Sequence, residues 1–235
     1  MELEQNTKQQ NRKTIYLIRH GETVDNVSET LQGQRPGKLN ENGIQQAILR
    51  GKQMENYKIE RAWVSDLKRA HDTFLNIHQQ MKHKIPKIEL KEIVRERCFG
   101  EAQGWHNSKY REEEAKFKEI NGEDAEYVAE GAESQQDLNQ RVLLFIEELK
   151  DFIKDEKSEK SLVVVSHGIF LRRLLHFMKE QTIGSQLMHD HLKYSNVELT
   201  EFQASVDEGS GALQLHSWKK ERLPGQPEVL DRAQM

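Results

Sequence analysis

Short apolar runs alternate along the chain with longer segments in which apolar residues recur at every third or fourth position. Unbroken runs such as "TIYLI" and "SLVVVS" are typical of buried strands, and two late segments alternate around the turn-like "VDEGSG". The pattern predicts strands at 14–18, 61–65, 87–94, 161–166, 196–202 and 212–218. Of these, 87–94 is either a strand throughout or a strand with an extended continuation.

The periodic segments predict helices between these strands. One helix lies near 43–56, one starts near Leu67 and one occupies 169–178. The clearest follows Ser134, where one face carries Leu138, Val142, Phe145, Ile146, Leu149, Phe152 and Ile153. Strands that alternate with helices imply a largely parallel sheet covered on both faces, and such sheets bind ligands beyond the carboxyl ends of their strands.

One folded domain accounts for most of the chain. Residues 1–13 are almost wholly polar, and 221–235 contain two prolines and a glycine, so we expect a disordered N-terminal tail and a loosely attached C-terminal one. The 235 residues are long enough for one sizeable core, and no internal repeat interrupts the pattern. The predicted domain is therefore 14–220.

Composition narrows the classes of partner. The net charge of −4 arises from 35 basic and 39 acidic residues that are interspersed, which predicts binding to neither nucleic acid nor a membrane surface. No segment is apolar for long enough to span a bilayer. One cysteine, Cys98, excludes an internal disulfide framework and agrees with a reducing compartment, so we expect a cytoplasmic protein. The oligomeric state is left open by these features.

Two predicted strands run directly into His-Gly, at His20 and His167. A single histidine at a strand end is most often structural, but two at equivalent ends of parallel strands favour a shared site. Arg19 precedes the first histidine, and Arg69 follows another strand by about one helical turn. Glu96 lies in "RERCFGEAQG", ahead of a glycine turn.

These residue types suit phosphoryl transfer. Guanidinium groups match phosphoryl oxygens and keep their charge, a neutral imidazole can act as nucleophile, and a second, cationic imidazole can stabilise developing charge. A carboxylic acid can protonate the leaving alkoxide and later activate water. Glycines after the histidines, Gly21 and Gly168, let backbone N–H groups approach an anion.

The motif series resembles the histidine phosphatase, or phosphoglycerate mutase-like, superfamily over roughly 14–218. The motifs are "RHGET" followed by Asn26, "LQG" at 31–33, "SDLKRA", "RERCFGEAQG" and "VVVSHG". The resemblance implies a three-layer α/β/α sandwich with a mostly parallel sheet and no metal or other cofactor. It implies that His20 is phosphorylated, that Glu96 donates a proton and that the phosphate pocket contains Arg19, Arg69, His167 and Gly168. Asn26, Gln32 and Gly33 would lie on its substrate side.

Within that superfamily the chain is similar to the phosphatase branch, in particular to the fructose-2,6-bisphosphatase type. Mutases carry a long basic insertion with paired arginines, whereas this chain offers only Lys109 and Arg111 before an acidic run. We therefore expect hydrolysis of a small phosphorylated metabolite, for example a sugar bisphosphate such as fructose 2,6-bisphosphate. The alternatives are mutase-type transfer and a module that binds a phosphorylated ligand without turnover.

Three groups of charged residues outside these motifs are weaker candidates for a role in the site. The loop "RPGKLNENG" departs from the usual pattern, so Arg35 and Lys38 either grip a second phosphate or lie in a solvated turn. Arg172 and Arg173 are expected to point at least partly away from the pocket. The run "REEEAKFKE" is a solvated face or a partner helix.

Two other kinds of catalytic site fit poorly. Cys98 is excluded as a phosphatase nucleophile, because a Cys-x5-Arg loop needs arginine where Gly104 stands. The "HDH" at 189–191 is a weak metal motif, since it lacks a pattern such as His-Glu-x-x-His.

Overall fold

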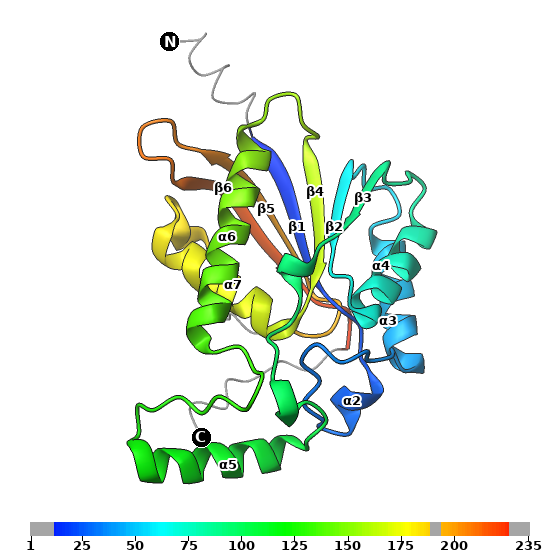
Figure 1. The fold of residues 1–235 in the computed structure, drawn as a ribbon. Coiled ribbons are helices and arrows are strands. Elements are labelled where there is room, and N and C mark those ends of the chain that lie inside the picture. The colour runs from blue at the N-terminus through cyan, green and yellow to red at the C-terminus, as the bar shows by residue number, and fades with distance from the viewer. Residues whose placement is uncertain (1–11, 189–193, 226–235) are drawn as a thin grey trace.

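One six-stranded sheet forms the centre of the computed structural model, which describes residues 12–188 and 194–225. The strand order is β3-β2-β4-β1-β5-β6 (Figure 1). The strands are β1 (Lys13–Arg19), β2 (Arg61–Val64), β3 (Lys87–Leu90), β4 (Ser161–Ser166), β5 (Leu199–Val206) and β6 (Leu213–Glu221). The first four run parallel, β5 pairs antiparallel with β1, and β6 pairs antiparallel with β5. The sheet is therefore mostly parallel, as predicted.

Helices cover both faces of this sheet. They are α3 (Glu41–Gln53), α4 (Lys68–Gln80), α6 (Gln135–Lys154) and α7 (Gly168–Gln181). In Figure 1, α3 and α4 lie on one side of the strands and α6 and α7 on the other. Alternate residues of β1 enter the two cores: Ile15 and Leu17 pack with α6 and α7, whereas Ile18 packs with α3 and α4. The predicted three-layer α/β/α sandwich is confirmed.

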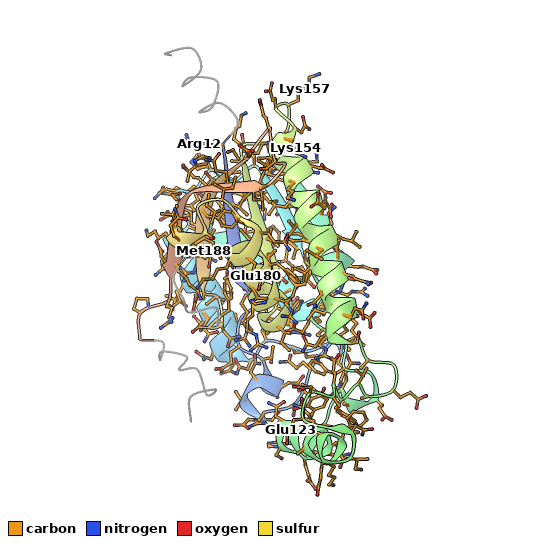
Figure 2. The ribbon with its side chains drawn as sticks, turned by 90° about the vertical axis from the view of Figure 1, so that its left-hand side faces the viewer. Arg12, Glu123, Lys154, Lys157, Glu180 and Met188 are labelled. Atoms are coloured by element: carbon orange, nitrogen blue, oxygen red, sulfur yellow. The ribbon has the colours of Figure 1, made fainter. Side chains whose placement is uncertain are left out.

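α6 illustrates how local sequence sets these elements. The Ser134 side chain accepts a hydrogen bond from the backbone N–H of Asp137, and the Asp137 side chain accepts one from the backbone N–H of Ser134. Every apolar residue predicted for the inner face of this helix is buried. Figure 2 shows Lys154, its last residue, at the opposite end of the molecule from Glu123.

Five strands differ in their bounds from the sequence pattern. β2 ends at Val64, one residue earlier than predicted, and β6 continues to Glu221, three residues further than predicted. β3 ends at Leu90 and a 3-10 turn, η1 (Glu92–Val94), follows it. β5 begins at Leu199 because the chain first turns at Val197, whose φ is 52°. Lys13, assigned above to the polar tail, is the buried first residue of β1, where its Nζ donates to the carbonyl of Phe152 at 2.5 Å.

A separate group of segments lies beyond the carboxyl ends of the parallel strands (Figure 1). It contains α2 (Val24–Val27), η2 (Gly100–Ala102) and α5 (Asn107–Asn121). The charged run "REEEAKFKE" belongs to α5, which buries none of its residues. Tyr110 of α5 packs against Phe99 and Tyr127, with ring centroids 5.5 Å apart in both pairs. These contacts attach α5 to the chain that follows β3.

The chain between α7 and β5 contains one further short turn, η3 (Ser185–Leu187). No helix within the described ranges is both long enough and apolar enough to cross a membrane.

Candidate active site

The two His-Gly sequences meet at one edge of the sheet. β1 and β4 are adjacent and parallel, and their register pairs Arg19 with Ser166. His20 and His167, the next residues, therefore leave the sheet together, with ring centroids 5.2 Å apart. Both side chains are buried.

Each ring nitrogen of His20 has one hydrogen-bond partner, and the two partners together define the tautomer. Nδ1 lies 2.7 Å from the carbonyl oxygen of Gly21, an acceptor, so Nδ1 carries the proton. Nε2 accepts from the Nε–H of Arg69 at 3.3 Å, which requires a lone pair on Nε2. Burial, together with the charges of Arg69 and Arg19, holds the pKa of His20 well below its usual value. The ring is thus neutral, with its lone pair on Nε2.

Two arginines lie beside this ring. Arg69 is buried, and its guanidinium also donates to the carbonyls of Gly33 at 2.7 Å and Arg35 at 3.1 Å. Burial lowers the pKa of Arg69 to about 10, so it remains charged at neutral pH. Arg19 donates to the carbonyl of Tyr194 at 2.7 Å.

Buried polar atoms without partners point to a ligand in this site. Of the seven buried side-chain N or O atoms that make no hydrogen bond within the described residues, three belong to residues predicted for this site: Arg19 Nε, His167 Nδ1 and Gln32 Oε1. An unpaired buried polar atom is costly, and such atoms are rare in folded proteins. An anion would give Arg19 Nε the acceptor that it lacks.

His167 differs from the cationic imidazole expected from sequence. Burial and the nearby Arg69, His20 and Arg19 hold the pKa of His167 well below its usual value. In this structure the second imidazole is therefore neutral.

Glu96 lies where the chain after β3 meets the start of α7. Its carboxylate accepts from the backbone N–H groups of Arg97 at 3.0 Å, Ile169 at 3.1 Å and Phe170 at 3.0 Å. The last two belong to the first turn of α7, so Glu96 supplies acceptors that the helix start lacks. Arg141 of α6 donates to the carbonyl of Glu96 at 3.3 Å and holds this segment in place.

A cleft of about 320 Å³ opens over these residues. Every residue predicted for the site lines it except His167, which lies against His20. The predicted residues that line it are Arg19, His20, Asn26, Gln32, Gly33, Arg69, Glu96 and Gly168. The structure thus brings the whole predicted set together at the carboxyl ends of β1 and β4.

The two glycines after the histidines differ in their surroundings. The Gly21 N–H donates to the hydroxyl of Thr73 at 2.9 Å, and a Cβ at Gly21 would lie 2.6 Å from the carbonyl oxygen of Gly43. Gly21 therefore permits close packing against α3, and its N–H group is not available to an anion. Gly168 lines the cleft beside Arg19.

Arg172 corrects the expectation for its helix. It follows Gly168 by four residues, so it lies on the same helical face, and it lines the cleft. Its side chain is exposed, and no hydrogen-bond or ion-pair partner is found for it in the described part of the chain. Arg173 does point away, donating to Gln135 at 2.8 Å.

The loop "RPGKLNENG" contributes a backbone carbonyl to the site rather than a charged side chain. Arg35 and Lys38 are exposed, and neither lines the cleft. The Arg35 guanidinium lies over Gly104, where a Cβ would approach it to 2.5 Å, while the Arg35 carbonyl accepts from Arg69. A solvated turn therefore describes these two side chains.

Sequence reasoning missed a third segment that closes the site, residues 194–197. Asn196 Nδ2 donates to the carbonyl of His20 at 2.9 Å, and the Val197 N–H donates to the carbonyl of Arg19 at 3.0 Å. Tyr194 lines the cleft and accepts from Arg19. A local motif could not reveal these contacts, since 176 positions separate Asn196 from His20.

Other candidate chemistry lies elsewhere. Cys98 does not line the cleft; its Sγ lies near Gly131 and Gln103. Within the ranges that the structure describes, no group of three or more His, Cys, Asp or Glu side chains could hold a metal ion. The "HDH" at 189–191 lies outside the described residues.

Comparison with known proteins decides the family. The sequence model of the histidine phosphatase superfamily (branch 1) matches residues 15–215. The chain belongs to the histidine phosphatase superfamily. It is 29% identical over 202 residues to "Probable phosphatase C1687.21" of Schizosaccharomyces pombe, covering 85% of this chain and 90% of that protein.

A second relative and a solved structure extend the match. The "Metal-independent phosphoserine phosphatase" of Arabidopsis thaliana is 31% identical over 180 residues, which cover 74% of this chain and 72% of that protein. The crystal structure of phosphoglycerate mutase from Bacillus anthracis superposes with a TM-score of 0.67 at 21% identity, covering 88% of this chain and 92% of that one. That structure supports the fold alone.

The relatives of this superfamily member carry varied names. "Fructose-2,6-bisphosphatase TIGAR" of Xenopus laevis is 32% identical over 152 residues, which cover 63% of this chain and 54% of that protein. The shared family is therefore shown, while the fructose-2,6-bisphosphatase resemblance does not stand out among its phosphatases.

Proposed function

We propose that this chain is a phosphatase that hydrolyses a small phosphorylated metabolite through a phosphohistidine on His20. One observation carries the proposal: the buried, neutral imidazole of His20 keeps a lone pair on Nε2 between two arginines. A neutral imidazole in a cationic site is suited to attack a phosphate monoester.

The first half-reaction transfers the phosphoryl group to the protein. Arg19 and Arg69 hold the phosphoryl oxygens, and His20 Nε2 attacks phosphorus, so that a P–N bond forms as the ester P–O bond breaks. Glu96, in its acid form, gives its proton to the leaving alkoxide. The alcohol then leaves the cleft.

The second half-reaction restores the protein. The Glu96 carboxylate takes a proton from a water molecule, whose oxygen attacks phosphorus. The P–N bond breaks, its electron pair returns to Nε2, and inorganic phosphate leaves. No step requires a metal ion, so we propose metal-independent turnover.

The cleft supports a small substrate with a second anionic group. A volume of about 320 Å³ suits a metabolite rather than a phosphoprotein surface. Arg172 offers an exposed guanidinium on the wall of the cleft, and guanidinium groups bind carboxylate and phosphate. Phosphoserine and fructose 2,6-bisphosphate both meet this description.

Hydrolysis is favoured over mutase transfer by the segment after Glu96. Lys109 Nζ lies over the ring of Trp105, 3.7 Å from its centroid, and Arg111 is exposed on α5. Neither side chain lines the cleft, so this segment supplies no arginine pair to hold a second phosphate.

Phosphate release from phosphosugars, phosphoserine and phosphoglycerates, measured with a chelator present, tests the proposal. We expect release by the wild type and none by His20→Ala. Activity that survives His20→Ala, or that requires metal, would overturn the mechanism. Isomerised phosphoglycerate without free phosphate would indicate a mutase, and bound phosphate without turnover would indicate a binding module.

The cytoplasm is the compartment that we propose, because the single cysteine of the sequence fits a reducing environment.

A further inference from the structure

His167 raises a question that the proposed mechanism does not answer. Its ring is neutral in this structure, so only one of its two nitrogens carries a proton. Nε2 lies 2.8 Å from the hydroxyl oxygen of Ser65, while Nδ1 is buried and has no partner. The tautomer decides whether the unpartnered nitrogen offers a proton or a lone pair.

The hydrogen bonds of Ser65 settle the tautomer. Its Oγ accepts from the backbone N–H of Leu67 at 3.3 Å, and within the described residues its one proton finds no acceptor besides His167 Nε2. If Nε2–H donated instead, the buried Ser65 proton would be unpaired and a bare lone pair would remain at Nδ1. The hydroxyl of Ser65 therefore donates to Nε2, and His167 carries its proton on Nδ1.

The backbone fixes Ser65 in this position. Ser65 follows β2, and its N–H donates to the carbonyl of Val165 in β4 at 2.9 Å, two residues before His167. Leu67, whose N–H the same hydroxyl accepts, is the N-cap residue of α4, the helix that carries Arg69. One buried hydroxyl thus connects His167 to the helix that carries Arg69.

We infer that Ser65 is a positioning residue that holds His167 as its Nδ1–H tautomer, so that Nδ1–H donates to the phosphoryl group on or near His20. This inference rests on the proposed function for the identity of the anion. The opposite tautomer would turn a lone pair towards a phosphoryl oxygen, and two electron-rich atoms repel each other. The 5.2 Å between the ring centroids of His20 and His167 places both within reach of one phosphoryl group.

Nitrogen-15 NMR of the imidazole rings tests the tautomer directly. His167 is assigned by comparison with His167→Gln, and the measurement uses the whole protein at neutral pH without substrate. We expect wild-type His167 to show a protonated Nδ1 and an unprotonated Nε2. A wild type protonated at Nε2 would overturn the inference whatever the enzyme hydrolyses.

Variants test the role of the hydroxyl. Ser65→Ala should mix the two tautomers of His167 and lower kcat/KM by on the order of tenfold, about what one hydrogen bond is worth. Ser65→Thr, which keeps the hydroxyl, should restore both. Ser166→Ala is the matched control, because Ser166 is an equally buried serine whose hydroxyl donates to the carbonyl of Val94 at 2.7 Å and not to an imidazole. It should leave the tautomer unchanged and kcat/KM within about twofold.

Binding of inorganic phosphate separates this inference from the proposed function. If no substrate is hydrolysed, Ser65→Ala should still weaken phosphate binding, whereas Ser166→Ala should not. Equal losses in the two alanine variants with an unchanged His167 signal would show that Ser65 acts through packing alone and would overturn the inference.

Discussion

His20 and His167 follow neighbouring parallel strands and precede glycine, yet their surroundings give them different chemistry. His20 binds its own backbone through Nδ1 and turns a lone pair on Nε2 towards Arg69. His167 is held by a side chain at Nε2 and leaves Nδ1 without a partner. We therefore propose that the same strand–His–Gly sequence supplies a nucleophile at one strand end and a hydrogen-bond donor at the other. The hydrogen-bond partners of each imidazole ring, rather than the His-Gly sequence, distinguish the two histidines.

The largest expected effect is the loss of kcat when His20, the proposed nucleophile, is replaced. His20→Ala removes the nitrogen that we propose attacks phosphorus, so kcat should fall by on the order of 10⁴-fold or more. Acid-labile label from a ³²P-phosphorylated substrate should be absent from the variant. His176→Ala is the control, since His176 lies on the half-exposed side of α7, pairs with Glu180 at 3.1 Å and does not line the cleft. Labelled variant protein would show that another residue is the nucleophile.

Glu96→Gln should lower kcat by about 10²-fold to 10⁴-fold, because an amide cannot donate the proton that the leaving group needs. The loss should shrink for p-nitrophenyl phosphate, whose leaving group needs little protonation. Glu96 also accepts hydrogen bonds from the start of α7, so the free energy of unfolding should fall by about 1 kcal/mol. Equal losses of kcat for both kinds of substrate would argue against an acid role.

Arg172→Ala tests whether the wall of the cleft binds a second anionic group of the substrate. KM should rise by on the order of tenfold for a substrate with a second anionic group and change little for one without, because a charge-assisted hydrogen bond is lost. Arg173→Ala, which alters the next residue of α7 outside the cleft, should leave both values of KM unchanged. A uniform rise in KM across the two substrate types would remove Arg172 as the contact for a second anion.

Sequence patterns located the parts of this site that depend on strand ends. His20 and His167 were placed at one edge because two apolar runs end in the same way, and a parallel sheet aligns such ends. Contacts made across long stretches of chain left no such pattern. Ser65, Asn196 and Arg141 act through hydrogen bonds to segments that only the folded chain brings near.

Three other differences between the sequence prediction and the structure have physical causes of their own. The direction of Arg172 was wrong because helical spacing shows which residues share a face of α7, but it does not show that this face borders the cleft. α5 was not predicted as part of the fold because it buries none of its residues, so no apolar period marks it. Gly21 was expected to admit an anion, but its close neighbour is the backbone of Gly43.

The smallest expected effect concerns the pH dependence of stability, which tests the neutrality that the two histidines share. Both pKa values lie below the unfolded value of about 6.5, so the unfolded chain binds more protons as pH falls below that value. Stability contributed by neutral His20 and His167 is therefore complete above about pH 6.5 and is lost below it. Between pH 6.5 and 5.5 we expect a loss of about 1 kcal/mol per histidine.

Urea unfolding of the wild type, His20→Gln and His167→Gln at these two pH values measures that loss. Each glutamine variant should lose less stability than the wild type, because it lacks one group that must stay neutral in the folded state. Carboxylates contribute equally to all three proteins and cancel in the difference. If one variant alone shows the reduced loss, the other histidine is protonated in the folded chain, and the two strand ends differ in charge.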